Sequence, residues 1–174
     1  QCAIDNQLDV VVMLHADGQY APEFLPAMLQ PFVDEQADVV LGSRMMDRHS
    51  ALKGGMPKYK FVGNIVLTAI QNLFSGMRLS EFHSGYRAYS VELLKTIHFW
   101  ENTDEWHFDA QILLQVKHSG ARIKEISIPT YYGDEICHVN GMAYGLNCIW
   151  TAFGYFLYRN NIYYSRKYDV ERQG

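Results

Sequence analysis

The chain has 174 residues, of which 48% are hydrophobic and 20% are charged. This balance excludes a disordered chain and a collagen-like repeat, and it fits one globular domain that can bury a core. The 15 Lys and Arg are scattered among 19 Asp and Glu without a basic stripe, so a nucleic-acid partner is not expected.

The three cysteines do not form a recognisable framework. Their number is odd, and the spacing of Cys2, Cys137 and Cys148 matches neither a CxxC motif nor a zinc site. A reduced, cytoplasmic setting is therefore expected rather than a disulfide-bonded, secreted one. The chain starts at Gln1 and soon enters a strongly apolar segment, which predicts a truncated protein.

The first part of the chain predicts a strand, a helix and a second strand. Residues 9–14 are almost continuously apolar, as in a strand covered on both faces. After Pro22, which suits a first helical turn, apolar residues recur at helical spacing from Leu25 to Val33. Residues 38–42 form a second apolar run. This order is typical of an α/β fold with a mainly parallel, Rossmann-like sheet flanked by helices.

Polar side chains follow both predicted strands. His15, Asp17 and Gln19 come after the first strand, and Ser43 and Arg44 come after the second. Ligands bind at the carboxyl ends of strands in open parallel sheets, so these residues are expected to share one rim. Asp17 and Gln19 offer oxygen ligands that suit Mg²⁺, and the imidazole of His15 suits Mn²⁺ better. A simple Asp-Gly turn is the alternative interpretation.

The second part of the chain predicts further helices and one more strand. Residues 45–57 mix glycine, proline and charge, which indicates a mobile loop. Apolar residues then keep the spacing of a long helix from Pro57 to Phe74. Helices are expected near residues 90–98 and 107–118, and a strand at residues 122–129.

The segment SEFHSGYRAYS, residues 80–90, gathers side chains that can exchange protons or bind anions. Glu81 or His83 could act as a general base, and Arg87 could bind an anion. Arg44 is a candidate phosphate ligand, because a guanidinium can bind a phosphate through two hydrogen bonds. The alternatives are a polar surface loop with one structural ion pair, and a solvated arginine at position 44.

The C-terminal region, residues 139–174, predicts an aromatic-rich helical extension. Residues 139–158 carry no charge, but glycine and asparagine interrupt the apolar spacing, so a helix that packs on the core or lies at an interface is expected rather than a membrane span. Aromatic and basic residues alternate in the segment 155–168, which could make peripheral membrane contact at the inner face of a membrane. An ordinary surface helix is the alternative.

Several short motifs together carry a resemblance to a known family. HADGQY, GSR, GGMPKYKFVGN, SEFHSGYRAYS, FDAQILL and IPTYYGDE occur in an order and at a spacing similar to those of inverting family 2 glycosyltransferases of the GT-A fold. That group includes dolichyl-phosphate mannose synthase and polyprenyl-phosphate or cell-envelope sugar transferases. The resemblance covers roughly residues 5–138.

The resemblance implies roles for individual residues. The family's DxD motif holds a divalent metal on the donor diphosphate, and here it corresponds to His15 and Asp17, with Gln19 at a position that faces the metal in some members. Histidine replaces the first acid, which implies a weaker metal site or a hydrogen bond to phosphate. Glu81 takes the place of the acid near the acceptor and is the leading candidate for a general base, although an ionised phosphate acceptor needs none.

Other positions are implied in the same way. Arg44, with Ser43, and Arg87 resemble residues that meet the donor and acceptor phosphates. Gly54 and Gly55 resemble a mobile acceptor loop that closes over the site. The implied reaction is a single displacement, assisted by Mg²⁺ or Mn²⁺, from a UDP- or GDP-linked sugar to a lipid-phosphate or glycan acceptor, with inversion at the anomeric carbon.

The family's fold begins with strands and helices that bind the nucleoside, and residues 1–138 correspond to the catalytic part that follows them. The isolated chain is therefore expected to bind nucleotide weakly or not at all. Two alternatives remain open: a catalytically degenerate transferase domain that serves as an interaction module, and a sugar nucleotidyltransferase. The exposed edge of an incomplete sheet also predicts pairing between copies, that is, a homo-oligomer.

Overall fold

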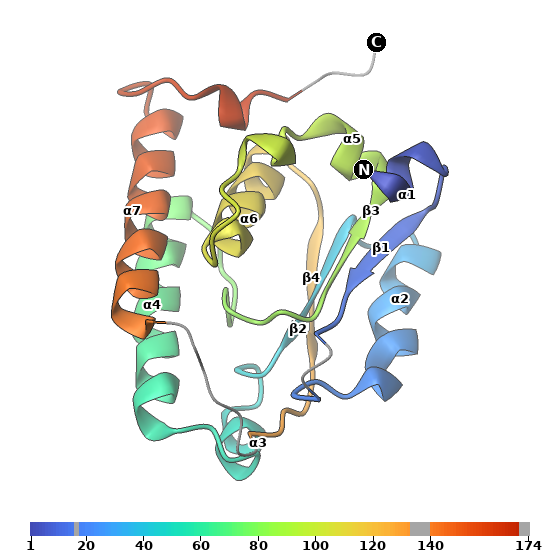
Figure 1. Ribbon diagram of the computed structural model, residues 1–174, viewed down its shortest axis with the longest axis vertical. Helices are drawn as coiled ribbons and strands as arrows, with labels where there is room; N and C mark the ends of the chain where they lie inside the picture. The colour runs from blue at the N-terminus through green and yellow to red at the C-terminus, as the bar shows by residue number, and fades with distance from the viewer. Residues whose placement is uncertain (16–17, 133–139, 171–174) are drawn as a thin grey trace.

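The computed structural model describes residues 1–15, 18–132 and 140–170 (Figure 1). At its centre is a four-stranded sheet with the order β1-β3-β2-β4. The strands are β1 (Val10–Met13), β2 (Val39–Ser43), β3 (Arg87–Ser90) and β4 (Ile123–Ser127). Helices lie on both sides of the sheet, which confirms the expected α/β class.

The sheet is mixed, whereas the sequence predicts a mainly parallel one. β3 runs antiparallel to both β1 and β2, and β2 pairs with β4 in parallel. β1, β2 and β4 therefore run in the same direction, and their carboxyl ends lie at the same edge of the sheet. A strand–helix–strand order would place the first two strands side by side, but β3 lies between them.

The helices of the described residues vary from a single turn to five turns. They are α1 (Cys2–Asp5), α2 (Leu25–Val33), α3 (Arg48–Lys53), α4 (Lys58–Ser75), α5 (Val91–Thr96), α6 (Phe108–Ser119) and α7 (Gly141–Arg159). Short 3-10 turns occur at Pro22–Phe24, Phe99–Glu101 and Arg166–Tyr168. The long helix predicted after Pro57 is confirmed as α4, and it ends at Gly76 in the left-handed conformation.

Helix α3 corrects the expectation of a mobile loop at residues 45–57. The carboxylate of Asp47 accepts hydrogen bonds from the main-chain amides of His49 and Ser50, so it caps the first turn. Asn140 caps α7 in the same way, through the amides of Met142 and Ala143.

Two hydrophobic clusters cover the two faces of the sheet. Val39 and Leu41 of β2 point into one cluster with α5 and α6, and Val40 points into the other with Met28 of α2. This alternation follows from the pleat of a strand. α7 packs against α4 and α6, where Tyr155 lies in a smaller cluster with Leu114. Within the described residues, no helix is both long enough and apolar enough to cross a bilayer.

Candidate active site

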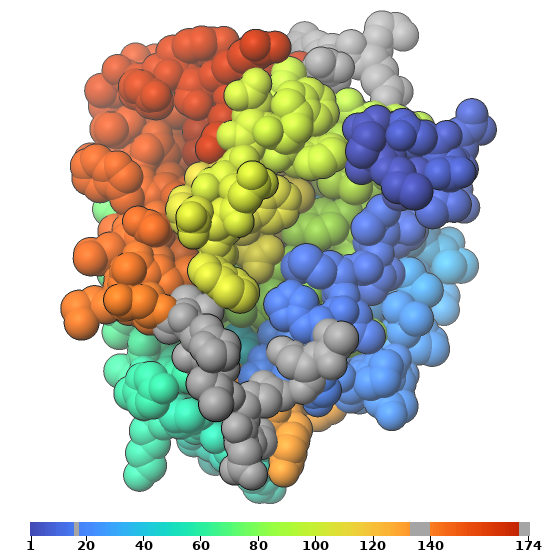
Figure 2. All heavy atoms as spheres, viewed as in Figure 1, coloured from blue at the N-terminus to red at the C-terminus, as the bar shows by residue number. Residues whose placement is uncertain are grey.

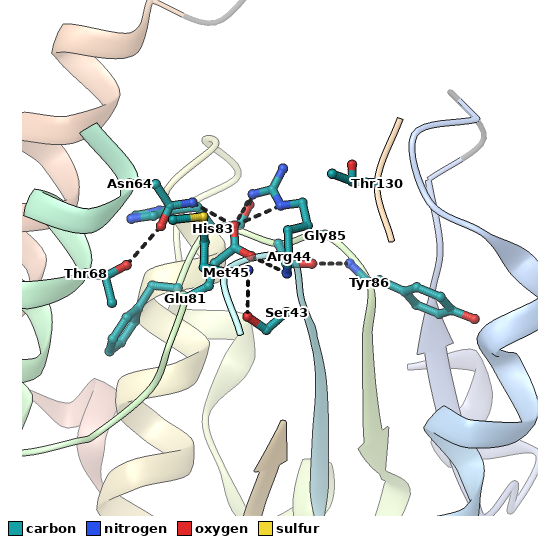
Figure 3. Close-up of polar contacts among 12 residues, drawn as sticks. Ser43, Arg44, Met45, Asn64, Thr68, Glu81, His83, Gly85, Tyr86 and Thr130 are labelled. Carbon is teal, nitrogen blue, oxygen red and sulfur yellow. Dashed lines mark hydrogen bonds and ion pairs between the residues drawn. The ribbon is translucent and has the colours of Figure 1, made fainter. Parts of the chain in front are cut away.

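The centre of the site is an ion pair between Arg44 and Glu81 (Figure 3). Arg44 directly follows β2, and Glu81 lies in the loop that leads to β3. One carboxylate oxygen of Glu81 accepts a hydrogen bond from the main-chain amide of Arg44 at 2.8 Å, and the other accepts from its Nε at 2.9 Å and from its Nη2. The Glu81 side chain is fully buried. The sequence identified Arg44 and Glu81 as candidate site residues, but it did not predict that they contact each other.

The pairing keeps both groups charged. Burial alone would raise the pKa of the Glu81 carboxyl, but the charge and hydrogen bonds of Arg44 hold that pKa below its usual value. Burial likewise opposes the charge of Arg44, yet Glu81 raises the pKa of the guanidinium overall. In this arrangement Glu81 faces Arg44, so its predicted role as a general base stays a prediction.

Other segments converge on the Arg44 guanidinium. Its Nη1 donates to the hydroxyl of Tyr132 at 2.8 Å, and its Nη2 donates to the main-chain oxygen of His83 at 3.0 Å. The guanidinium carbon lies 5.8 Å from the centre of the Tyr20 ring. Arg44 thus joins the loops that follow β1, β2 and β4 with the loop that precedes β3.

The sequence assigned no role to Asn64 and Tyr132, two members of this network, and the same holds for Tyr20. Asn64 of α4 donates to the Glu81 carboxylate at 2.7 Å and is itself held by Thr68, one helical turn later. Tyr132 binds Arg44 as described. Both residues lie in motifs that carry the family resemblance, GGMPKYKFVGN and IPTYYGDE, and that position is the only signal the sequence offers for them.

Ser43 is buried and turned toward Ser80. The two hydroxyl oxygens are 2.6 Å apart, and Ser80 in turn donates to the carboxylate of Glu125 on β4. The Ser43 hydroxyl also accepts hydrogen bonds from the amides of Met45 and Met46. These contacts fix the turn that carries Arg44, while donor-phosphate binding by Ser43 stays a prediction.

His83 is held in a neutral form by its surroundings. Its Nδ1 lies 2.9 Å from the hydroxyl of Tyr144 on α7, and burial lowers the pKa of the imidazole to about 4. Its Nε2 is buried and has no hydrogen-bond partner among the described residues. A neutral imidazole can accept one proton or one hydrogen bond, so a catalytic role for His83 is chemically open.

Arg87 lies beneath the loop rather than at its surface. Its guanidinium donates to the main-chain oxygens of Ser84, Phe82 and Asp109 at 2.6, 2.7 and 2.9 Å, and it lies 3.5 Å from the Asp109 carboxylate. The residue is 1% exposed. This geometry fixes the loop at residues 82–84 to the start of α6, and the predicted contact of Arg87 with an anion stays a prediction.

The loop after β1 meets the loop before β3 through His15 and Gly85. A Cβ atom on Gly85 would lie 2.5 Å from Cε1 and 2.8 Å from Nε2 of the His15 ring, so a side chain at this position would force the imidazole to move. The amide of Gly85 also donates to the hydroxyl of Tyr20 at 2.9 Å. The HADGQY and SEFHSGYRAYS motifs therefore meet in the structure, a contact that was not predicted from the sequence.

The predicted metal ligands are described only in part. Asp17 lies outside the described residues. His15 is exposed, and the main-chain oxygen of Gln19 accepts hydrogen bonds from Thr130 and Tyr131. Among residues 1–15, 18–132 and 140–170, no group of three or more His, Cys, Asp and Glu is placed to hold a metal ion.

Gly54 and Gly55 pack against the segment after β4. The main-chain oxygen of Gly54 accepts from the amide of Tyr132 at 2.8 Å, and a Cβ atom on Gly54 would overlap the main-chain oxygen of Thr130. Gly55 has a positive φ of 85°. These glycines thus hold Tyr132 beside Arg44, and closure of a mobile acceptor loop stays a prediction.

Comparison with known proteins identifies related sequences. The family described as "Glycosyl transferase family 2" matches residues 6–97, more than half of the chain. An uncharacterized protein of Methanocaldococcus jannaschii is 33% identical over 132 residues, which are 76% of this chain and 54% of that protein.

Two similar relatives have functional names. The UDP-N-acetylglucosamine–dolichyl-phosphate N-acetylglucosaminyltransferase of Methanococcus voltae is 31% identical over 124 residues, 71% of this chain and 49% of that protein. The dolichyl-phosphate hexose transferase of Haloferax volcanii is 33% identical over 122 residues, 69% of this chain and 49% of that protein. The chain spans about half the length of these curated relatives.

Proposed function

Because this chain belongs to glycosyl transferase family 2, we propose that it forms the acceptor-side part of an enzyme that transfers a sugar from a nucleotide-linked donor to a lipid phosphate. The names of two relatives specify dolichyl phosphate, which supports this class of acceptor. The donor in this proposal is a UDP- or GDP-linked sugar, and the configuration of the anomeric carbon is inverted.

The observation that carries the proposal is the position of Arg44. Its guanidinium stands at the carboxyl end of β2, where the loops after β1 and β4 also arrive, and it contacts Tyr20, Glu81 and Tyr132. A guanidinium held at this edge of an α/β sheet can donate hydrogen bonds to a phosphate, while the paired Glu81 balances its charge. Because its partners hold it in place before substrate arrives, little reorganisation is needed during the reaction.

The proposed acceptor decides the role of Glu81. A phosphate oxygen is already ionised near neutral pH and attacks the anomeric carbon without a base, so Glu81 acts here as a positioning residue that orients Arg44. The bond from the anomeric carbon to the donor diphosphate breaks as the new bond to the acceptor oxygen forms. A glycan hydroxyl acceptor would instead need a base, and Glu81 or His83 is the candidate in that case.

A divalent cation belongs to the proposal because the donor set has the right chemistry. The carboxylate of Asp17 and the side-chain amide oxygen of Gln19 are hard ligands for Mg²⁺ or Mn²⁺, and His15 adds a nitrogen ligand that suits Mn²⁺. When bound, the metal would neutralise charge on the diphosphate leaving group. Arg44 lies at the same edge of the sheet, with its charge balanced by Glu81.

Sugar transfer to a short polyprenyl phosphate tests the proposal. Labelled UDP- and GDP-sugars would be supplied with Mn²⁺ in detergent, using both this chain and a polypeptide of the full length of its relatives. Arg44→Lys should lower transfer strongly, whereas Arg48→Lys on the exposed surface of α3 should not. The anomeric configuration of the product, measured by NMR, tests inversion.

Calorimetric titration with UDP and GDP separates the alternatives. Metal-dependent binding that Asp17→Ala abolishes, together with transfer, supports the proposed enzyme. Folded full-length protein that neither binds nucleotide nor transfers sugar would overturn it and favour a degenerate interaction module. Release of pyrophosphate from a nucleoside triphosphate and a sugar phosphate would instead identify a sugar nucleotidyltransferase.

A further inference from the structure

The buried side of helix α4 is polar. Its four buried residues recur at helical spacing on one side of the helix and form what is here called the polar stripe: Asn64, Thr68, Gln71 and Ser75. A helix usually turns apolar side chains inward, because burying a polar group costs free energy unless it is hydrogen-bonded. Such departures from local rules are typical of functional sites, so the polar stripe points to a role beyond packing.

Asn64 connects the polar stripe to the candidate site. Its Nδ2 donates to Oε1 of Glu81 at 2.7 Å, and Glu81 holds Arg44 (Figure 3). At the other end of the stripe, the hydroxyl of Ser75 donates to the main-chain oxygen of Gln71 and stays within the helix. The two ends of the stripe therefore have different tasks, and the end at Asn64 reaches the ion pair.

Thr68 determines which way the Asn64 amide faces. The Thr68 hydroxyl donates to Oδ1 of Asn64 at 3.1 Å, one helical turn away. Because the amide oxygen accepts this bond, the amide nitrogen, which is a donor, is turned toward Glu81. In the reversed amide, the oxygen would face the carboxylate, and two acceptors repel each other. Thr68 thus selects the orientation in which Asn64 can donate to Glu81.

The bond from Asn64 acts on the carboxylate oxygen that holds the guanidinium. Oε1 of Glu81 accepts from Nε and Nη2 of Arg44 and from Asn64, whereas Oε2 accepts from the main-chain amide of Arg44. Rotation of the carboxylate about its last bond would disturb these contacts. A donor on a long helix opposes that rotation, so the direction of the guanidinium depends on Asn64.

The bond between Asn64 and Glu81 is shielded from water. Figure 2 shows the start of α4, in blue-green, at the lower left of the molecular surface. The residues of α4 that precede Asn64 are exposed or half-buried, and Asn64, at 7% exposure, is the first buried residue of the helix. A hydrogen bond to an ionised group is stronger in such surroundings, and its loss is costlier.

We propose that Asn64 is a positioning residue for sugar transfer, which acts through Glu81 to keep the Arg44 guanidinium in the orientation that meets a substrate phosphate. Thr68 supports Asn64 in this role by holding its amide. Asn64 itself touches Glu81 rather than a reacting atom. The link to the transfer reaction rests on the proposed function, whereas the control of Arg44 by Asn64 does not.

NMR of the arginine side chains tests the control of Arg44 without any substrate. In protein labelled with ¹⁵N-arginine, Arg44→Lys identifies the Nε–H signal of Arg44, whose hydrogen is bonded to Glu81. Asn64→Ala should speed the exchange of this hydrogen with water by about tenfold or more. Asn72→Ala, on the same helix, is the matched control and should leave it unchanged, because Asn72 bonds to the main chain of Leu79. An unchanged Arg44 signal in folded Asn64→Ala overturns the proposal.

Asn64→Asp provides a reading that a merely structural role would not change. The introduced carboxyl would stand beside the Glu81 carboxylate, and repulsion between the two should raise its pKa. When protonated it can donate to Glu81 as the amide does, and when ionised it cannot. Sugar transfer by this variant, relative to the unchanged protein, should therefore fall by about tenfold as the pH rises from about 5.5 to about 8.5.

The surrounding charges do not confuse this measurement. In the unchanged protein the pKa of Glu81 is lowered and that of Arg44 is raised, and the pKa of His83 is about 4, so none of them changes its charge across the assay range. Asn72→Asp is the matched control, and its transfer relative to the unchanged protein should not vary with pH. A ratio that is constant for Asn64→Asp as well overturns the proposal.

Two variants of Thr68 test the orientation of the amide while keeping its surroundings packed. Thr68→Val keeps the shape of the side chain but removes the hydroxyl, and it should lower kcat/KM for transfer by about threefold or more. Thr68→Ser retains the hydroxyl and should recover most of that loss. Equal losses in the two variants would show that the hydroxyl does not act through Asn64, and would overturn the role given to Thr68.

The exchange and transfer measurements separate this inference from the proposed function. If the unchanged full-length protein transfers no sugar, the proposed function fails, and the NMR measurement still decides whether Asn64 controls Arg44. If the unchanged protein transfers sugar and folded Asn64→Ala keeps the full rate, the positioning role fails while the proposed function stands.

Discussion

Glu81 holds Arg44 by its main chain and its side chain at once. The carboxylate accepts from the Arg44 amide at 2.8 Å and from its Nε at 2.9 Å, so it fixes both the end of β2 and the direction of the guanidinium. Removing the acid would leave a buried cation without its counter-charge, a defect that commonly costs several kcal/mol.

We therefore expect Glu81→Ala to lower the free energy of unfolding by about 3–5 kcal/mol. Glu81→Gln keeps the shape and should cost less. Asp38→Ala is the matched control, because it breaks the exposed Asp38–Arg122 pair and should cost about 1 kcal/mol or less. Urea unfolding measures all three, and equal effects of Glu81→Ala and Asp38→Ala would contradict the structural role given to Glu81.

Gly54 should tolerate no side chain. An added Cβ would overlap the main-chain oxygen of Thr130, and a main-chain atom cannot turn aside. Gly54→Ala should therefore cost at least about 2 kcal/mol and disturb the neighbouring Tyr132. Gly63→Ala, in the interior of α4 with open space around its Cβ, should instead stabilise by about 0.5–1 kcal/mol. Thermal unfolding of the two variants should shift in opposite directions.

The contact of His15 with Gly85 predicts a specific rescue. Gly85→Ala places a methyl group against the imidazole, but the exposed His15 ring can turn aside, so the cost should be about 1 kcal/mol. His15→Ala removes the exposed ring and should cost little by itself. The double variant should recover most of the stability lost by Gly85→Ala, which a double-mutant cycle measures. Simple addition of the two losses would show that Gly85 is required for another reason.

The lowered pKa of the buried His83 predicts that the stability of the fold depends on pH. Its pKa is about 4 in the folded protein and 6.5 without burial, so between these values the unfolded chain binds the proton and the folded chain does not. The stability that depends on a neutral His83 is fully present above pH 6.5. As the pH falls toward 4, the free energy of unfolding decreases by about 3 kcal/mol in total for this reason. Unfolding measured from pH 7.5 to 4.5 should show this slope.

The control for that slope is His83→Gln, which cannot titrate in this range. The difference in unfolding free energy between the two proteins should change across the stated window and be constant above it. His107 and His118 also have lowered pKa values through burial, and their contributions cancel in the difference because both proteins contain them. A constant difference at every pH would contradict a neutral, buried His83.

Local sequence patterns predicted elements that are long or strongly apolar. β2 was foreseeable from a short run of apolar residues, and α4 from apolar residues that keep helical spacing over nearly five turns. β3 was not, because Arg87–Ser90 is short and its place between β1 and β2 depends on partners far away in the sequence. α3 was missed as well, although Asp47 is a recognisable cap.

The candidate site was predicted as residues rather than as contacts. Glu81 and Arg44 were both identified, but separate roles were assigned to them, since nothing local shows that side chains 37 positions apart pair. Asn64 and Tyr132 had no assigned role, because an amide or a phenol in a motif has many uses. The metal site at Asp17 stays a prediction.

The position of β3 also governs how the chain folds during synthesis. In the described residues, β1 forms its ladder with β3 alone, and β2 pairs with β3 and β4. Among the described strands, β1 and β2 have no partner until residues 87–90 have left the ribosome. Two apolar strands are therefore made before β3 can pair with either of them, and we expect this interval to be exposed to aggregation and to chaperone binding.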